Sequence, residues 1–339
     1  MLLYPRCPLA ASFLPATFLL LALAWSPACS SSDDPSGTDC DKCDAAADAN
    51  TGIGTADASP DEPDATPVEF CDRLGSYPAQ WISGGPDCGT EPDIQVHQLN
   101  DDTYILRQSL CTSGEAPFLY LLFGEDKALL EDTGDGGINL VSTVNAIVEE
   151  REAAAGHQIE LIVVNSHAHG DHVGANQAFA QDGATVVGAN KNSLSAFFGM
   201  SWPHDPAAFD LGNRIIDVFG IPGHQSDHIA IYDRNRGILL TGDTFYPGRL
   251  FINDFAAYKA SIAFLASFTQ TRELCAILGT HIEMSTTPGD DYDFGVDHHP
   301  NERPLQLTRT LLLELQTAIE AMGTTPVRQT HDDFIVFPL

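Results

Sequence analysis

The chain has 339 residues, 43 % of them hydrophobic, and a formal net charge of −31 at pH 7. This length and apolar content suffice for one substantial hydrophobic core. The charge disfavours nucleic acid as a partner, because phosphate binding requires clustered Lys and Arg, and the sequence contains no basic stripe.

The first residues have the pattern of a targeting segment. A start with one positive charge, Arg6, leads into an apolar run from Leu9 to Trp25, and small residues follow it. This order is typical of a secretory signal peptide, here residues 1–28. The run is short and contains Pro15, so it does not predict a helix that spans a membrane. We therefore expect the protein to be exported.

Residues 29–69 have the composition of a tether. The pair Ala28-Cys29 resembles the lipobox of bacterial lipoproteins, in which the cysteine is lipidated and becomes the new N-terminus, although Ser26 stands where that motif usually has Leu. Residues 30–69 then contain 11 Asp and Glu but one Lys, which predicts a disordered, self-repelling segment. We expect either a lipoprotein anchored to a membrane through Cys29, in the periplasm or on the cell surface, or a secreted protein.

Residues 70–339 carry the patterns of a folded catalytic domain. Short apolar runs predict strands, and longer runs with apolar residues three or four apart predict helices. In chain order we expect strands at 103–107, 118–123 and 127–131, a helix at 138–153, a strand at 159–165, a helix at 173–181, strands at 185–189, 215–219, 229–233 and 237–241, a helix at 256–267, a strand at 275–280 and a helix at 304–322. These patterns alone indicate an α/β or α+β fold.

The sequence has eight cysteines. Cys40 and Cys43 form a CxxC pair in the tether, where an oxidising compartment favours a disulfide or no role over a zinc site. We expect Cys71 and Cys88 to pair near the start of the folded domain. Cys275 lies in a run that reads as a buried strand, and we expect it to be an inert thiol.

One short segment carries most of the functional information. Directly after the strand predicted at 159–165, three imidazoles and a carboxylate occur within six residues: His167, His169, Asp171 and His172. Residues two apart in an extended chain point the same way, so the first two histidines can bind one ion, and the glycine after them lets the others face a second. Protonated histidines this close would repel each other. The cluster therefore indicates a metal of the zinc or iron class.

Three later strand ends each supply another ligand of the same type. His224 follows the strand predicted at 215–219, Asp243 follows the one at 237–241, and His281 follows the one at 275–280. Loops at one edge of a sheet commonly build such sites.

The block His-x-His-x-Asp-His, followed by a distal His, an Asp and a final His, resembles the metallo-β-lactamase superfamily of binuclear metal hydrolases. The resemblance implies an α+β fold, a four-layer αββα sandwich of two facing sheets with helices outside. It also implies that His167, His169 and His224 bind the first ion, that Asp171, His172 and His281 bind the second, and that Asp243 bridges them. Asp132 would match an aspartate that supports the site without binding metal.

The resemblance further implies a hydrolase that uses two Zn²⁺ ions. A hydroxide bridging them would attack a carbonyl or phosphoryl centre, with Asp171 or Asp243 handling the proton as catalytic residues. The expected substrate is a small ester, thioester or lactone. Hydrolysis of β-lactams is an alternative, disfavoured because those branches usually lack an equivalent of Asp243. Glutathione thioesters are disfavoured because few basic residues follow His281.

Two other interpretations stay open. A persulfide dioxygenase with one Fe²⁺ would share much of the ligand block. A surface lipoprotein that binds metal without catalysis is the third interpretation, which the complete ligand set disfavours. The identity of the metal separates the first two.

Several further residues attract attention. We expect His228 to support a ligand by hydrogen bonding rather than to bind metal. We expect His298 and His299 to lie in a solvated loop. The aromatic-rich segments 197–209 and 245–255 are expected either to wall the substrate pocket or to pack in the core.

Overall fold

The computed structural model describes residues 70–339. The predicted signal peptide, the lipidation of Cys29, the acidic tether and the CxxC pair lie outside the described residues. Within residues 70–339, no helix is both long enough and apolar enough to cross a membrane.

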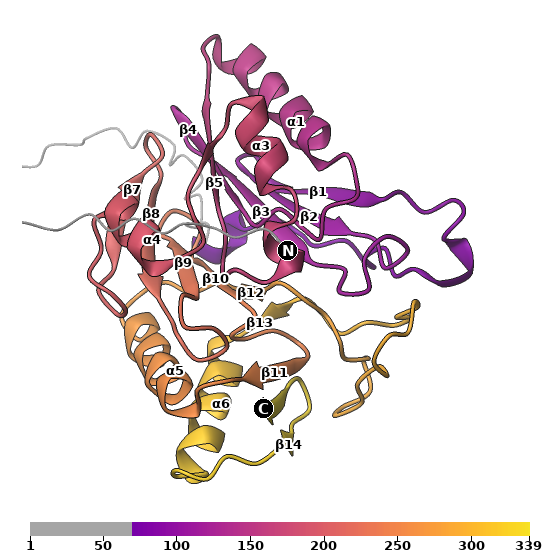
Figure 1. Cartoon of the computed structure of the whole chain (residues 1–339), viewed down its shortest axis with the longest axis vertical. Coiled ribbons are helices and arrows are strands. Elements are labelled where there is room, and N and C mark those ends of the chain that lie inside the picture. Colours follow the sequence, from indigo (N-terminus) through magenta and orange to yellow (C-terminus); the bar gives the residue numbers. More distant parts are fainter. Residues whose placement is uncertain (1–69) are drawn as a thin grey trace, which may run out of the picture. The chain divides into compact units, whose positions relative to one another are not determined.

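The first half of the described chain forms a six-stranded sheet with the strands in sequence order (Figure 1). Its first four strands are antiparallel, whereas β4, β5 and β6 are parallel to one another. The strands are β1 (Ile94–Asn100), β2 (Thr103–Gln108), β3 (Phe118–Phe123), β4 (Lys127–Glu131), β5 (Glu160–Val164) and β6 (Thr185–Val186).

The second half forms another six-stranded sheet, ordered β13-β12-β10-β9-β8-β7, in which β10 and β12 are parallel. Its strands are β7 (Ala207–Asp210), β8 (Ile215–Gly220), β9 (Ile229–Asp233), β10 (Ile238–Gly242), β12 (Ala276–Gly279) and β13 (Gln306–Leu307). A small third sheet joins β11 (Arg249–Ile252), β15 (Ile335–Pro338) and β14 (Gln329–Thr330).

The alternation of β3 shows how the layers pack. Phe118, Tyr120 and Leu122 lie in the core between the two large sheets. Leu119 and Leu121 point the other way, into a second core beneath helices α1 (Leu140–Ala155) and α3 (Asn176–Asp182). Helices α5 (Phe255–Thr269) and α6 (Arg309–Ala321) cover the outer face of the second sheet (Figure 1). The predicted four-layer αββα sandwich is confirmed.

The predicted helices differ from the observed ones chiefly at their ends. The helix predicted at 304–322 begins at Arg309, because Thr308 caps it by accepting a hydrogen bond from the Leu311 N–H (3.3 Å), and because residues 306–307 form β13. The strand predicted at 185–189 has only two residues in the sheet. Elements that the patterns did not predict are α4 (Lys191–Phe198), the 3₁₀ helices at Phe70–Arg73 and Gly85–Asp87, and strands β1, β7, β11, β14 and β15.

The helix predicted at 173–181 corresponds to α3, which begins at Asn176, and a separate short helix, α2 (Gly170–Val173), precedes it and ends before Gly174. The Gly174 N–H donates to the carbonyl of Gly134 (2.8 Å), which draws the loop after β4 against this turn. A Cβ atom at Gly174 would lie 2.4 Å from the backbone carbon of Asp135. The close approach of two backbones therefore requires glycine and ends the first helix.

The predicted cysteine pairing is wrong. Cys71 is bonded to Cys275, 204 residues away, and Cys88 is bonded to Cys111. Cys275 is thus not an inert thiol. The 3₁₀ helix at Phe70–Arg73 lies against the start of β12, an arrangement that spacing along the chain does not reveal.

Candidate metal centre

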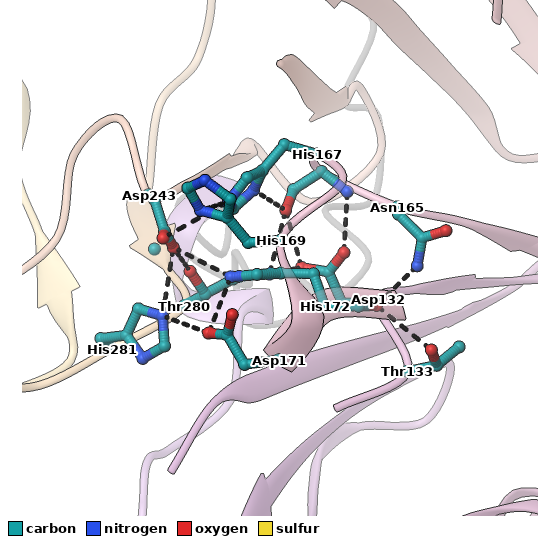
Figure 2. A network of polar contacts seen from close by, with 12 residues as sticks. Asp132, Thr133, Asn165, His167, His169, Asp171, His172, Asp243, Thr280 and His281 are labelled. Carbon is teal, nitrogen blue, oxygen red and sulfur yellow. Dashed lines mark hydrogen bonds and ion pairs between the residues drawn. The ribbon is translucent and has the colours of Figure 1, made fainter. Parts of the chain in front are cut away.

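The predicted ligands converge from four chain segments at one edge of the sandwich. His167 and His169 follow β5, and Asp171 and His172 lie in the short helix α2 that comes next. The remaining three follow strands of the second sheet, and Figure 2 shows the side chains from both sheets turned toward a common centre. These segments follow the ends of β5 in the first sheet and of β8, β10 and β12 in the second.

The first group of ligands contains His167, His169, His224 and Asp243, whose ligand atoms all lie within 4.8 Å of one another. The Nδ1 atom of His169 is 2.8 Å from Nε2 of His167 and 3.1 Å from Nε2 of His224. Oδ2 of Asp243 is 3.6 Å from Nε2 of His167 and 3.5 Å from Nε2 of His224.

The second group contains Asp171, His172 and His281, again within 4.8 Å. Oδ2 of Asp171 is 3.1 Å from Nε2 of His172 and 3.4 Å from Nε2 of His281. The other oxygen of Asp243, Oδ1, is 3.2 Å from Nε2 of His281 and 3.4 Å from Nε2 of His172. Asp243 therefore presents one oxygen to each group, as a bridging ligand would.

Contacts on the outer side of the histidines show that the two groups fit cations. His224 and His281 each donate their Nδ1 proton to a backbone carbonyl, that of Phe251 and that of Glu115 (both 2.8 Å). His172 donates its Nδ1 proton to Asp132 (2.8 Å). A neutral imidazole has one N–H, so each inner Nε2 presents a lone pair to the centre.

Lone pairs and carboxylates turned toward one another at about 3 Å require positive charge between them. Nε2 of His172 is buried and has no hydrogen-bond partner within the described part of the chain. When no ion is bound, burial opposes a charge on His172, but the carboxylates of Asp243 and Asp132 raise its pKa well above the usual value, so these surroundings favour a positive charge that a bound cation can supply in place of the proton. Imidazole and carboxylate are ligands that zinc accepts, so the residues present fit divalent cations.

Asp132 supports the centre from behind and lies in neither ligand group. Its carboxylate accepts hydrogen bonds from the Ser166 N–H (2.7 Å), from the Ser166 hydroxyl (2.8 Å) and from Nδ1 of His172. The Ser166 hydroxyl in turn accepts the Nδ1 proton of His167 (3.1 Å). One carboxylate thus orients two histidines (Figure 2).

His228 is buried behind the first group and is not one of its members. Its ring stacks on that of His167, with centroids 4.8 Å apart, and its Nε2 accepts a hydrogen bond from the Asp243 N–H (3.1 Å). Burial lowers the pKa of His228 to about 3, so the ring is neutral and can accept this bond. The hydroxyl of Thr280, which the sequence patterns did not single out, donates to Oδ1 of Asp243.

The prediction of a solvated loop is wrong for His299. This side chain is buried, its ring stacks on Tyr292 with centroids 4.2 Å apart, and its backbone N–H donates to the carbonyl of Ser83 (2.9 Å). The segment 245–255 divides between the two expected roles: Phe245 packs in the core, whereas Phe251 stays half-exposed.

The ligand order and the sandwich are matched by comparison with known proteins. The family model described as "Metallo-beta-lactamase superfamily" matches residues 115–319. The chain belongs to the metallo-β-lactamase superfamily. The match covers every predicted metal ligand of the chain.

Several curated members are similar over part of their length. The hydroxyacylglutathione hydrolase of Methylococcus capsulatus is 32 % identical over 159 residues, which cover 44 % of this chain and 60 % of that protein. The hydroxyacylglutathione hydrolase of Microcystis aeruginosa is 34 % identical over 131 residues, which cover 35 % of this chain and 51 % of that protein. The chain thus spans between half and two thirds of these relatives. The human acyl-coenzyme A thioesterase MBLAC2 is 25 % identical over 235 residues, 59 % of this chain and 81 % of that protein.

Among solved structures, a metallo-beta-lactamase from Pontibacter korlensis aligns with a TM-score of 0.46 and 15 % identity, covering 67 % of this chain and 99 % of that one.

Proposed function

We propose that the chain is a metal-dependent hydrolase that acts on an ester, thioester or lactone. The observation that carries the proposal is the position of Asp243, which turns one carboxylate oxygen to each of two groups of ligands. The named relatives, a hydroxyacylglutathione hydrolase and an acyl-coenzyme A thioesterase, support a thioester among the three bond types.

The cofactor that we propose is a pair of Zn²⁺ ions, held by the two ligand groups and shared through Asp243. Divalent cations in such a site activate water at neutral pH and polarise the carbonyl under attack. The chain itself supplies the geometry and the proton acceptors. Asp171 and Asp243 are the proposed acceptors, because their carboxylates face the centre and Asp171 keeps a side-chain exposure of 16 %.

Elemental analysis and activity together test this proposal. The full-length protein should contain about two zinc ions per chain and hydrolyse at least one acyl thioester or ester. Asp243→Asn should reduce kcat by about a hundredfold or more, because the amide nitrogen cannot ligate as a carboxylate oxygen does. Asp210→Asn, on the distant strand β7, is the matched control. One iron ion per chain, together with consumption of O₂ when a persulfide is added, would contradict the hydrolase proposal and support the persulfide dioxygenase.

We also propose export, either as a lipoprotein attached through Cys29 or as a secreted protein. The two disulfides support it, because disulfides form and persist in oxidising compartments. Cell fractionation distinguishes the two: attachment through Cys29 predicts that the wild-type protein sediments with membranes and that Cys29→Ala does not, whereas secretion predicts both in the soluble exported fraction. Recovery of the wild-type protein in the cytosol, with reduced cysteines, would contradict export.

A further inference from the structure

An arginine beside the site is paired with carboxylates of the protein itself. Arg249 begins β11, and its backbone carbonyl accepts a hydrogen bond from Tyr246, whose ring lies 5.5 Å from that of His281. Its guanidinium donates to Glu283 (3.1 Å) and to Asp291 (2.9 Å), and only 5 % of the side chain is exposed. A guanidinium already paired with two carboxylates is not free to bind an anionic substrate.

The surroundings of the site add negative charge. Glu115, whose carbonyl holds His281, and Glu283 both carry carboxylates beside the centre. Residues 70–339 contain 36 acidic residues against 14 basic ones. A field of this sign disfavours the approach of substrates that carry carboxylates or phosphates, although bound dications would offset it at the centre itself.

Aromatic rings lie beside β11, the strand that Arg249 begins. The carbonyl of Phe251 accepts the Nδ1 proton of His224, which fixes this residue next to a predicted metal ligand. Its neighbours Leu250 and Ile252 point into the core, so the half-exposed ring of Phe251 points to the opposite side of β11. Phe294 is 67 % exposed, lies 6.2 Å from Phe251 between ring centroids, and covers the guanidinium of Arg249 at 4.0 Å.

Phe337 of β15 extends this group, with its ring 5.0 Å from that of Phe251. We call Phe251, Phe294 and Phe337 the aromatic platform. Three adjoining phenyl rings, one of them largely exposed, form an apolar surface whose exposure is costly in water, and such surfaces commonly bind ligands. A carboxylate has no favourable contact with the face of a phenyl ring, whereas an alkyl chain packed on these rings is removed from water, which is favourable.

We propose that the aromatic platform binds the apolar acyl chain of an uncharged ester, thioester or lactone, and that Phe251 and Phe294 thereby set the substrate specificity of the site. The inference rests on the proposed hydrolase function and narrows its substrate class. It separates this chain from relatives whose names refer to glutathione and coenzyme A, both anionic carriers.

Kinetics with the zinc-loaded, full-length protein test the inference. The substrates are uncharged S-acyl-N-acetylcysteamines from acetyl to decanoyl, compared with S-decanoylglutathione. The wild-type kcat/KM should rise by about tenfold or more from acetyl to decanoyl and should be about tenfold lower for the glutathione thioester. In Phe294→Ser the decanoyl-to-acetyl ratio should fall about tenfold, mainly through KM.

Leu313→Ser is the matched control, because Leu313 is also an exposed apolar residue (45 %) but lies on α6. This variant should keep the wild-type ratio. Preference for the glutathione thioester, or an unchanged ratio in Phe294→Ser and Phe251→Ser, would overturn the inference while leaving the hydrolase proposal intact.

A binding measurement separates the two proposals if hydrolysis is absent. The probe is the uncleavable thioether S-decyl-N-acetylcysteamine, titrated by calorimetry. Binding that weakens about tenfold in Phe294→Ser would uphold the aromatic platform even for a protein that cleaves no thioester or ester. Binding that is absent from the wild-type protein, or equal in the variant, would refute it.

Discussion

At the scale of single residues, the orientation of the predicted ligands depends on hydrogen bonds that their imidazole N–H groups make on the side away from the centre. His172, His224 and His281 each give one ring proton to an oxygen away from the centre, which leaves the other nitrogen for a cation. Two of those oxygens are backbone carbonyls and one belongs to Asp132. Only the last can be altered by a simple substitution, so Asp132 offers the clearest test of how much this orientation contributes.

We expect Asp132→Asn to weaken zinc binding by about 10- to 100-fold, because an amide can replace only part of the hydrogen bonding of a carboxylate that orients a ligand. Competition with a chromophoric zinc chelator measures the affinity. Asp210→Asn, at the end of β7, should bind zinc like the wild-type protein. Equal affinity in both variants would show that Asp132 does not orient His172.

At the scale of elements, strand β4 places an acid inside the sandwich. Its alternation puts Glu131 on the same face as Leu129 and opposite Tyr120, a residue of the core between the sheets. Neither carboxyl oxygen of Glu131 has a hydrogen-bond partner within residues 70–339. Burial, reinforced by the neighbouring charge of Asp132, raises the pKa of Glu131 well above its usual value.

This raised pKa sets the sign of a pH effect. The folded state keeps a proton that the unfolded state loses above about pH 4.3, so wild-type stability falls as pH rises beyond that point. Glu131→Gln removes the titration, and we expect it to raise the free energy of unfolding by about 1–3 kcal/mol at pH 8 and to give a smaller gain at pH 4. Urea unfolding at both pH values measures this. Exposed Glu160→Gln should show no such trend, and a gain that is constant with pH would contradict the burial argument.

At the scale of the whole molecule, the disulfide between Cys71 and Cys275 ties the start of the described chain to the second sheet. It closes a loop with a sequence separation of 204, whereas the Cys88–Cys111 bond closes one of 23. A cross-link stabilises a protein chiefly by restricting its unfolded state, and a longer loop is restricted more.

We therefore expect replacement of Cys71 and Cys275 by Ser to lower the free energy of unfolding by about 2–4 kcal/mol. Replacement of Cys88 and Cys111 should have a smaller effect, and urea unfolding compares the two. A larger loss from the short loop would mean that local packing, and not restriction of the unfolded chain, governs the contribution of these bonds.

Local sequence patterns were enough to predict many of the strands and the types of the ligand residues. The runs that became β2, β3, β4, β8 and β9 were predictable because a buried strand has its apolar signature within a few consecutive residues. The same holds for the ligand types, since metal-binding side chains next to strand ends are visible without any knowledge of contacts. Short edge strands such as β7 and β14 carry too few residues for a pattern.

By itself the sequence determined an α/β or α+β fold and, through the family resemblance of its ligand motif, the layered sandwich and the seven residues that the structure brings together in two ligand groups. The tertiary structure alone decided the disulfide partners, the burial of His299, and the carbonyls of Glu115 and Phe251 that hold His281 and His224. The physical reason is the separation of the interacting residues along the sequence. Periodicity and motif spacing are properties of neighbouring residues, whereas these contacts join segments that only the closure of the two sheets brings within bonding distance.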